Sequence, residues 1–284
     1  MTAESGLVVV DKPGGMTSHD VVSRVRRLTG TRKIGHAGTL DPMATGVLVL
    51  GVNRATRLLG HLTLTDKRYA ATLRLGVTTT TDDAEGEVVA TRPTDGLTEE
   101  RVRDALAAFV GEIDQVPNAV SAVKVGGRRA YARARAGEQV DLPARRVTVH
   151  AIDVIDVGLP DIGIEVRCSS GTYVRAIARD LGEVLGVGGH LTELRRTAVG
   201  PFSLTDARTL DELGERLTMT PIAEAARTSF PALDLDEPEA ADVRVGRRLD
   251  LTLDATTALF APDGEFLALY EPAEIGARAV AVFV

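Results

Sequence analysis

The densest chemical signal in the sequence is a glycine-rich stretch, Gly35–Gly46, which carries one carboxylate directly before a proline. It reads GHAGTLDPMATG. Its glycines permit tight backbone paths, while Pro42 favours an extended Asp41 and limits the local freedom of the chain. The carboxylate of Asp41 is therefore presented from a stiff loop. Aspartate before proline is also a common turn residue, so the loop alone leaves a structural and a catalytic interpretation open.

Other candidate residues have ordinary structural explanations when each is taken alone. Arg175 and Arg179 are four apart on a predicted helix and could form surface pairs with acidic neighbours on the same helix. Tyr69 could be a strand tyrosine packed in a sheet. His36 could form hydrogen bonds within a turn.

Charge is distributed unevenly along the chain. The 284 residues have a formal net charge of −7. The acidic excess lies after residue 205, and the residues before it are slightly basic. Basic residues cluster between Lys124 and Arg146, which suits either a solvated surface or a polyanionic partner.

Several classes of protein are disfavoured by what the sequence lacks. It has a single cysteine, Cys168, which suits a reducing compartment. We find no signal-peptide pattern and no apolar stretch of membrane-spanning length, so the expectation is a cytoplasmic protein without a membrane partner. Walker, dinucleotide-fingerprint, His-Glu-x-x-His and cysteine-cluster motifs are absent, so neither a metal site nor a small-molecule cofactor is predicted.

The elements that must position these residues alternate irregularly between strands and helices. Strands are predicted at 7–10, 47–52, 67–75, 146–157 and 162–168, and helices at about 18–28, from 98 to near 111, and from a Thr172 cap to about 185. The spacing is not that of a doubly wound fold. It predicts an α+β fold whose largely antiparallel central sheet is flanked by helices.

The chain turns rich in proline and acidic residues around Phe230–Pro238, which is typical of a domain boundary. We therefore predict two domains, at residues 1–230 and 231–284. The second contains the segment Val243–Arg248 and two apolar runs that flank the turn Pro262-Asp263-Gly264, a pattern typical of a small β module.

Six blocks, in order along the chain, resemble the motifs of TruB-type pseudouridine synthases. They are Val10–Ser18, the loop around Asp41, Lys67–Tyr69 with Leu75-Gly76, Pro117–Gly127 with Tyr131–Arg133, Cys168–Arg175, and Leu194–Phe202. The C-terminal segment resembles a PUA domain, an RNA-binding module, although here it is short and acidic. The resemblance covers residues 7–205 and implies a catalytic domain at 1–230 followed by a PUA-like domain.

The resemblance implies an enzyme that isomerises uridine 55 in the T arm of tRNA to pseudouridine, without a metal or cofactor. Asp41 is the implied catalytic carboxylate, acting at C6 of the base, at C1′ of the ribose, or in a glycal route. The implied catalytic set is completed by Arg175, as the ion-pair partner of Asp41, and by Tyr69, which stacks on the target base.

The resemblance also implies a set of substrate-binding residues. His36 fills the space that the flipped nucleotide leaves, and the other implied contacts to RNA or walls of the pocket are Arg57, Asp83, Tyr173 and Leu194. Because Asp82 is adjacent, the family aspartate could match either Asp82 or Asp83. The implied partner is the T-arm stem-loop of tRNA, bound by a monomer.

Three alternatives stay open at this point. One is a non-catalytic RNA-binding or tRNA-folding protein, which would not need Asp41. Another is a glycoside hydrolase that pairs Asp41 with Asp83. The third is a guide-RNA-dependent synthase acting in a complex, which the compact chain without basic extensions disfavours.

Overall fold

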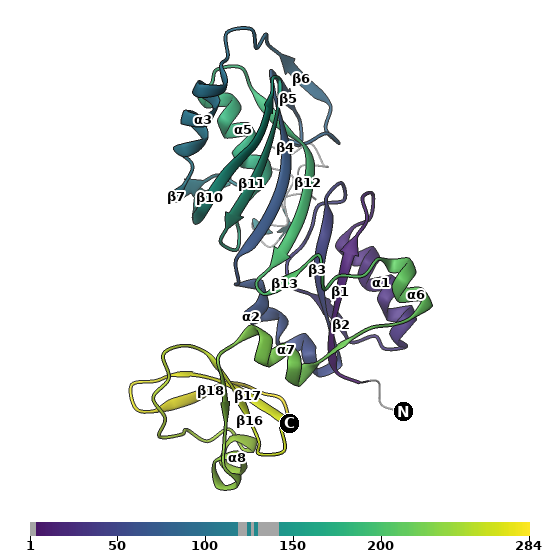
Figure 1. The fold of residues 1–284 in the computed structure, drawn as a ribbon, viewed down its shortest axis with the longest axis vertical. Coiled ribbons are helices and arrows are strands. Elements are labelled where there is room, and N and C mark those ends of the chain that lie inside the picture. The colour runs from purple at the N-terminus through teal and green to yellow at the C-terminus, as the bar shows by residue number, and fades with distance from the viewer. Residues whose placement is uncertain (1–3, 119–123, 126–127, 130–141) are drawn as a thin grey trace. The chain divides into compact units, whose positions relative to one another are not determined.

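The computed structural model describes residues 4–118, 124–125, 128–129 and 142–284. The chain forms two compact units (Figure 1). The first comprises residues 1–41, 47–63 and 200–284, and the second comprises 42–46 and 64–199.

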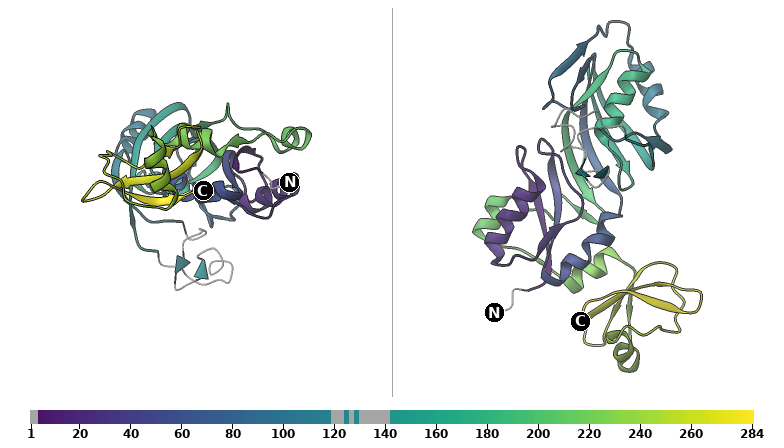
Figure 2. Two further views of the ribbon diagram at one scale, coloured as in Figure 1. Left: turned by 90° about the horizontal axis from the view of Figure 1, so that it is seen from below. Right: turned by 180° about the vertical axis from the view of Figure 1, so that it is seen from behind.

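The second unit is built on an antiparallel sheet with helices on one face. Strand β4 (Lys67–Leu75) lies between β11 (Asp161–Cys168) and β12 (Gly189–Val199), and β10 (Arg145–Gly158) continues the sheet from β11 to β7 (Gly111–Gln115). Helices α3 (Glu99–Ala107) and α5 (Val174–Val184) pack against this sheet (Figures 1 and 2). Short pairs complete the unit, with β5 (Val77–Thr79) against β6 (Val88–Thr91) and β8 (Lys124–Val125) against β9 (Arg128–Arg129).

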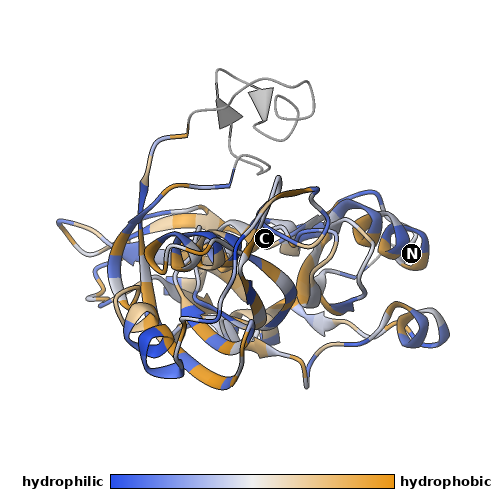
Figure 3. Cartoon of the chain, turned by 90° about the horizontal axis from the view of Figure 1, so that it is seen from above, coloured by the Kyte–Doolittle hydropathy of each residue, from blue (hydrophilic) through white to orange (hydrophobic). Residues whose placement is uncertain are grey.

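Buried and exposed side chains alternate along these strands, which explains why helices cover only one face of the sheet. On β4 the residues Ala71, Leu73 and Leu75 are buried, whereas Arg74, between the last two, and Arg68, near the start of the strand, are exposed. Buried and more exposed positions alternate in the same way along β11. Figure 3 shows hydrophobic and hydrophilic residues interspersed along the chain. Such a period of two gives a sheet one face for the helices and one for solvent.

The first unit begins with β1 (Gly6–Lys12) and α1 (Ser18–Thr29). Strand β1 has β14 (Thr220–Pro221) on one side and β3 (Thr45–Val52) on the other, and β2 (Ile34–His36) pairs antiparallel with β3. Short elements follow: η1 (Asn53–Arg57), α2 (Leu59–Thr63), β13 (Phe202–Ser203), α6 (Leu210–Glu215) and α7 (Ile222–Ser229).

The last part of this unit is a four-stranded sheet in the order β15 (Ala232–Asp234), β16 (Thr257–Phe260), β17 (Phe266–Pro272) and β18 (Ala277–Val282). Helix α8 (Glu237–Arg244) packs against it, and its core includes Leu235, Val243, Leu259 and Tyr270. We call residues 232–282 the C-terminal sheet.

The predicted fold class is confirmed, and local differences have physical reasons. Val243-Arg244 ends helix α8 rather than starting a strand, because Asp236 and Glu239 form a capping box that begins a helix there. Thr172 does not cap α5. Its hydroxyl donates to the carbonyl of Ser169, and Tyr173 takes the N-cap position without a side-chain cap.

Candidate active site

The loop that carries Asp41 is fixed by hydrogen bonds at two residues that precede the aspartate. Ser18, at the start of α1, accepts a hydrogen bond from the Leu40 amide at 2.9 Å and donates to the Leu40 carbonyl at 3.2 Å. Both residues are buried. Upstream, the Ala37 amide donates to the Val49 carbonyl. Asp41 itself is half-buried.

His36 lies on β2, opposite Leu50 of β3. The centroids of the His36 and His19 rings are 5.6 Å apart, and the two rings are nearly perpendicular. The stretch predicted as a long loop therefore contains a strand that holds this histidine. Arg57, at the end of η1, donates from Nη1 to the Val282 carbonyl at 2.5 Å. Arg57 and the C-terminal sheet are thus bonded to each other within the first unit.

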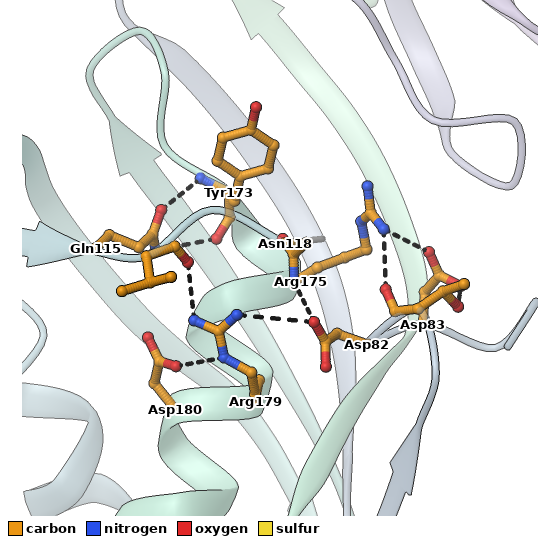
Figure 4. Close-up of polar contacts among 10 residues, drawn as sticks. Asp82, Asp83, Gln115, Asn118, Tyr173, Arg175, Arg179 and Asp180 are labelled. Atoms are coloured by element: carbon orange, nitrogen blue, oxygen red, sulfur yellow. Dashed lines mark hydrogen bonds and ion pairs between the residues drawn. The ribbon is translucent and has the colours of Figure 1, made fainter. Parts of the chain in front are cut away.

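A buried ion pair joins Arg175 and Asp83 in the second unit (Figure 4). Nη1 of Arg175 lies 3.1 Å from Oδ2 of Asp83, and each side chain is only 4% exposed. The same Nη1 donates to the Thr81 carbonyl at 2.9 Å. The other oxygen of Asp83 accepts from the Thr81 hydroxyl at 2.5 Å and from the Glu85 amide at 3.1 Å. Asp83 is thus hydrogen-bonded through both carboxylate oxygens, as a buried charge requires.

The start of α5, which carries Arg175, is held from β7. The Tyr173 amide donates to Oε1 of Gln115 at 2.8 Å, and Nε2 of Gln115 donates to the Tyr173 carbonyl at 3.1 Å (Figure 4). Gln115 is buried. A two-way bond of this kind fixes the backbone at the helix start and therefore the direction in which the next residues project.

Tyr69 and Leu194 lie on neighbouring strands of the same sheet. Tyr69 is half-buried on β4, opposite Val166 of β11 and Arg196 of β12. Leu194 is buried on β12, opposite Ala71. Leu194 lines a hollow of about 640 Å³ together with Met43, Thr45, Ala71 and Arg195, among other residues. Leu194 thus lines a pocket, and its role as a substrate-binding residue stays a prediction.

Three family models match the chain. They describe the N-terminal domain of TruB family pseudouridylate synthases over residues 26–174, the C-terminal domain of tRNA pseudouridylate synthase B over 175–230, and the C-terminal part of tRNA pseudouridine synthase II over 230–284. The chain belongs to the TruB family of tRNA pseudouridine synthases. It is therefore an enzyme, an isomerase that produces pseudouridine.

Curated relatives and solved structures agree with this membership. The tRNA pseudouridine synthase B of Nocardia farcinica is 60% identical over 286 residues, covering 98% of this chain and 92% of the relative. That of Arthrobacter sp. (strain FB24) is 56% identical over 295 residues, with coverages of 98% and 96%. Two solved structures contain a similar chain. The chain in a Cbf5-Nop10-Gar1 complex is 26% identical with a TM-score of 0.76. The chain in an H/ACA RNP bound to a substrate RNA containing 2′-deoxyuridine is 25% identical with a TM-score of 0.75. Each of these two covers 98% of this chain and 85% of the solved one.

In this TruB-family chain, the predicted site residues fall into both units. Asp83 and Arg175 are in direct contact in the second unit, and Tyr173 begins the helix that carries Arg175. Asp41, His36 and Arg57 belong to the first unit. The predicted pairing of Asp41 with Arg175 stays a prediction. A surface role for Arg175 is excluded by its burial.

Sequence reasoning missed the neighbours of the Asp83–Arg175 pair. Asp82 accepts a hydrogen bond from Nδ2 of Asn118 at 2.6 Å and lies 3.7 Å from Nη1 of Arg179 (Figure 4). Two signals pointed to this arrangement: the adjacent aspartates, and the arginines four residues apart on one helix face.

Burial shifts two ionisable groups that face each other across β4 and β11 of this TruB-family fold. Lys67 lies opposite Cys168. Burial, together with the nearby charge of Arg196, lowers the pKa of the Lys67 ammonium to about 8. Burial raises the pKa of the Cys168 thiol to about 11. Cys168 is therefore a protonated, buried side chain at neutral pH, as its apolar surroundings favour.

Part of the predicted RNA-binding surface lies outside the described residues. This applies to Ala119–Ala122 and Tyr131–Arg133 of the sequence motif and to Arg133 and Arg135 of the basic cluster. At the end of that cluster, Arg146 lies 3.2 Å from Asp114 and 3.6 Å from Glu112, all exposed. No group of three metal-ligating side chains occurs within the part of the chain that the structure describes. Nor does that part contain a helix long and apolar enough to span a membrane.

Proposed function

We propose that this enzyme isomerises uridine 55 in the T arm of tRNA, with Asp41 as the catalytic carboxylate. The tRNA substrate is supported by the curated relatives, which carry the name tRNA pseudouridine synthase B. The role of Asp41 is supported by its anchored loop. Ser18 holds Leu40, the residue before Asp41, through two hydrogen bonds, which limits the freedom of the half-buried aspartate.

The reaction breaks the bond between N1 and C1′, turns the base, and forms a bond between C5 and C1′. C5 then loses its proton, and N1 gains one. Attack at C6, attack at C1′, and a glycal route each need an ionised oxygen at a fixed position as nucleophile or base. A carboxylate in a stiff loop supplies that oxygen, whereas the isosteric amide of asparagine does not.

In this proposal, the remaining predicted residues bind and place the nucleotide. A base inside a folded arm must leave its stack before it can react, and planar side chains offset the lost stacking. His36 and Tyr69 supply planar rings. The Asp83–Arg175 pair and Tyr173 supply a fixed polar wall, Leu194 an apolar one, and Arg57 a cation on the surface.

The proposal extends to the setting of the reaction. A monomer acts in the cytoplasm on tRNA without a guide RNA, and residues 231–284 form a PUA-like domain that adds contacts to the RNA. The hydrogen bonds of Arg54 and Arg57 to carbonyls at the chain end support a fixed attachment of this segment to the residues around η1.

The deciding experiment compares Asp41→Asn with the wild type and with Asp161→Asn as a matched control. Asp161 forms an ion pair with Arg74 on an exposed part of the sheet, outside the residues proposed for the site. Each purified protein is incubated with tRNA transcript labelled with tritium at uridine C5, with no guide RNA or other protein present. Tritium release measures turnover, filter binding measures affinity, and carbodiimide primer extension locates the product.

We expect product at uridine 55 with the wild type and with Asp161→Asn. Asp41→Asn should bind tRNA but release no tritium. Release within tenfold of the wild type corresponds to a barrier change of only about 1.4 kcal/mol, which would reject Asp41 as the essential carboxylate. Wild-type activity at another uridine would reject the T-arm assignment, and activity that requires added guide RNA would favour a complex.

A further inference from the structure

Two of the contacts of the Arg175 guanidinium come from either side of one residue, Asp82. Its Nη1 bonds the carbonyl of Thr81, the residue before, and the carboxylate of Asp83, the residue after. Any shift of the backbone at Asp82 therefore moves both partners of the guanidinium at once. The placement of Arg175 depends on what fixes Asp82.

The backbone of Asp82 has a left-handed conformation, with φ of +59°. In an extended chain, consecutive side chains point to opposite faces, so Asp82 and Asp83 could not both contact helix α5. The left-handed turn makes this possible. Asp83 pairs with Arg175, and Asp82 approaches Arg179, one helical turn further along the same face of α5 (Figure 4).

Four contacts hold Asp82 in this conformation, and the first is the bond that its own amide donates to the Thr79 carbonyl at 3.4 Å. Its carbonyl accepts from the Leu191 amide at 3.0 Å, and its carboxylate accepts from Nδ2 of Asn118 at 2.6 Å. Arg179 lies 3.7 Å away, beyond hydrogen-bonding distance, and its side chain is 19% exposed. Asn118 is fully buried. The bond from Asn118 is therefore the stronger side-chain contact, and Arg179 adds a weaker charge interaction.

Arg179 also links this loop to the strand end beside it. Its Nη2 donates to the Val116 carbonyl at 2.9 Å, and its Nε contacts Asp180 at 2.7 Å. Val116 lies between Asn118 and Gln115, the residue that holds the start of α5 through the backbone of Tyr173. The segment from Gln115 to Asn118 thus fixes both the helix that carries Arg175 and the loop that partners it.

We propose that Asp82, Asn118 and Arg179 are positioning residues for the isomerisation, which set the place of the Arg175 guanidinium through the backbone of Asp82. They act through Arg175 and not on the substrate. This inference rests on the proposed function, because it assigns the Asp83–Arg175 pair to the site where the uridine reacts.

The test compares two substitutions at Asp82 that separate the side chain from the backbone. Glycine adopts a left-handed conformation without strain, so Asp82→Gly removes the anchor and keeps the local geometry accessible. Asparagine also tolerates this conformation and can still accept from Asn118, so Asp82→Asn is the conservative variant that should rescue most of the loss. Asp161→Asn is the matched control on the same sheet.

For Asp82→Gly we expect kcat on a T-arm hairpin to fall about tenfold, with KM within about twofold of the wild type. Asp82→Asn should lose about threefold or less, and Asp161→Asn should match the wild type. Asn118→Ala should resemble Asp82→Gly, and the double variant should be no slower than the slower single one, because both changes remove one bond. Arg179→Gln should have a smaller effect than Asn118→Ala.

Thermal unfolding of each variant is measured beside the kinetics, with all assays well below the lowest midpoint. Folded Asp82→Gly and Asn118→Ala with wild-type kcat would overturn the proposal. So would a lower kcat that disappears when the rates are corrected for the unfolded fraction, since that result shows a purely structural role. Failure of the proposed function is recognised separately, because Asp41→Asn would then keep its activity.

Discussion

The interiors of the second unit and of the C-terminal sheet are made of different residues. The second unit buries several charged and amide side chains, namely Lys67, Asp83, Gln115, Asn118, Arg175 and Arg196. The C-terminal sheet has a largely aliphatic core that includes Tyr270. The buried rings of Phe260, Phe266 and the adjoining Phe283 lie in series with tilted planes, at centroid distances of 5.4 and 4.6 Å. Its ion pair Arg244–Glu265 lies at the surface, with side chains 38% and 41% exposed.

This difference separates residues that hold a fold from residues that hold a site. Removing apolar surface from water stabilises the C-terminal sheet without any demand on geometry. A buried ion pair gives little net stability, because the desolvation of both charges offsets their attraction. A chain that buries Asp83 and Arg175 therefore gains a fixed charge arrangement rather than stability, which suits the role proposed above for this pair.

The largest effect is expected when one partner of the buried pair is neutralised. Asp83→Asn leaves the Arg175 charge buried without its counter-charge, and we expect a loss of about 3–5 kcal/mol of unfolding free energy. The same substitution in the exposed pair Arg74–Asp161 should cost less than about 1 kcal/mol. Urea denaturation of both variants measures the contrast. Equal losses would show that burial does not distinguish the two pairs.

A smaller effect is expected from the buried ammonium of Lys67, and it depends on pH. The pKa of Lys67 is about 8 in the folded protein, below the 10.5 of a free lysine. Between these values the unfolded chain holds a proton that the folded protein does not, so this lysine makes stability rise with pH, by at most about 1.4 kcal/mol per pH unit. Below pH 8 Lys67 is protonated in the folded and in the unfolded protein, so it no longer makes stability depend on pH.

The measurement compares the wild type with Lys67→Met in urea at pH 7.0 and pH 9.0. Cys168 is present in both proteins, so the opposite trend of its thiol, which loses stability as pH rises above 9, largely cancels. We expect the stability difference to move in favour of the wild type at pH 9.0. A difference that is equal at both pH values would mean that the ammonium of Lys67 is solvated.

The fold was largely predictable because it follows local patterns. Alternation predicted β4 at Lys67–Leu75. The helix predicted at about 18–28 is α1, which begins with a capping box at Thr17 and ends at a left-handed glycine, Gly30. Strand β2 was missed because it has three residues, one of them glycine, and exists through its pairing with β3. A pattern that short carries no period.

The site was predictable only in part, because its contacts join residues distant in sequence. The spacing of Arg175 and Arg179 pointed to partners on their own helix, and Arg179 does contact Asp180. The main partner of Arg175 comes instead from a loop 92 residues earlier, which no helical period can reveal. The bond from Asn118 to Asp82 depends on a left-handed backbone at Asp82, and the sequence there gives no glycine to announce it.

The smallest effect is expected at the surface of the C-terminal sheet, in the pair Arg244–Glu265. Its atoms lie 2.9 Å apart, closer than the 3.1 Å of the buried pair Asp83–Arg175. Distance alone would therefore rank the surface pair first. Solvent reverses the order, because water screens exposed charges and two long side chains must lose freedom to meet. We expect Glu265→Gln to cost less than about 1 kcal/mol, and added salt to remove most of that cost. A double-mutant cycle with Arg244→Gln in urea, at low and high salt, isolates the coupling of the pair. A coupling that persisted at high salt and approached the loss in Asp83→Asn would mean that the two interiors do not differ in the way their charges are used.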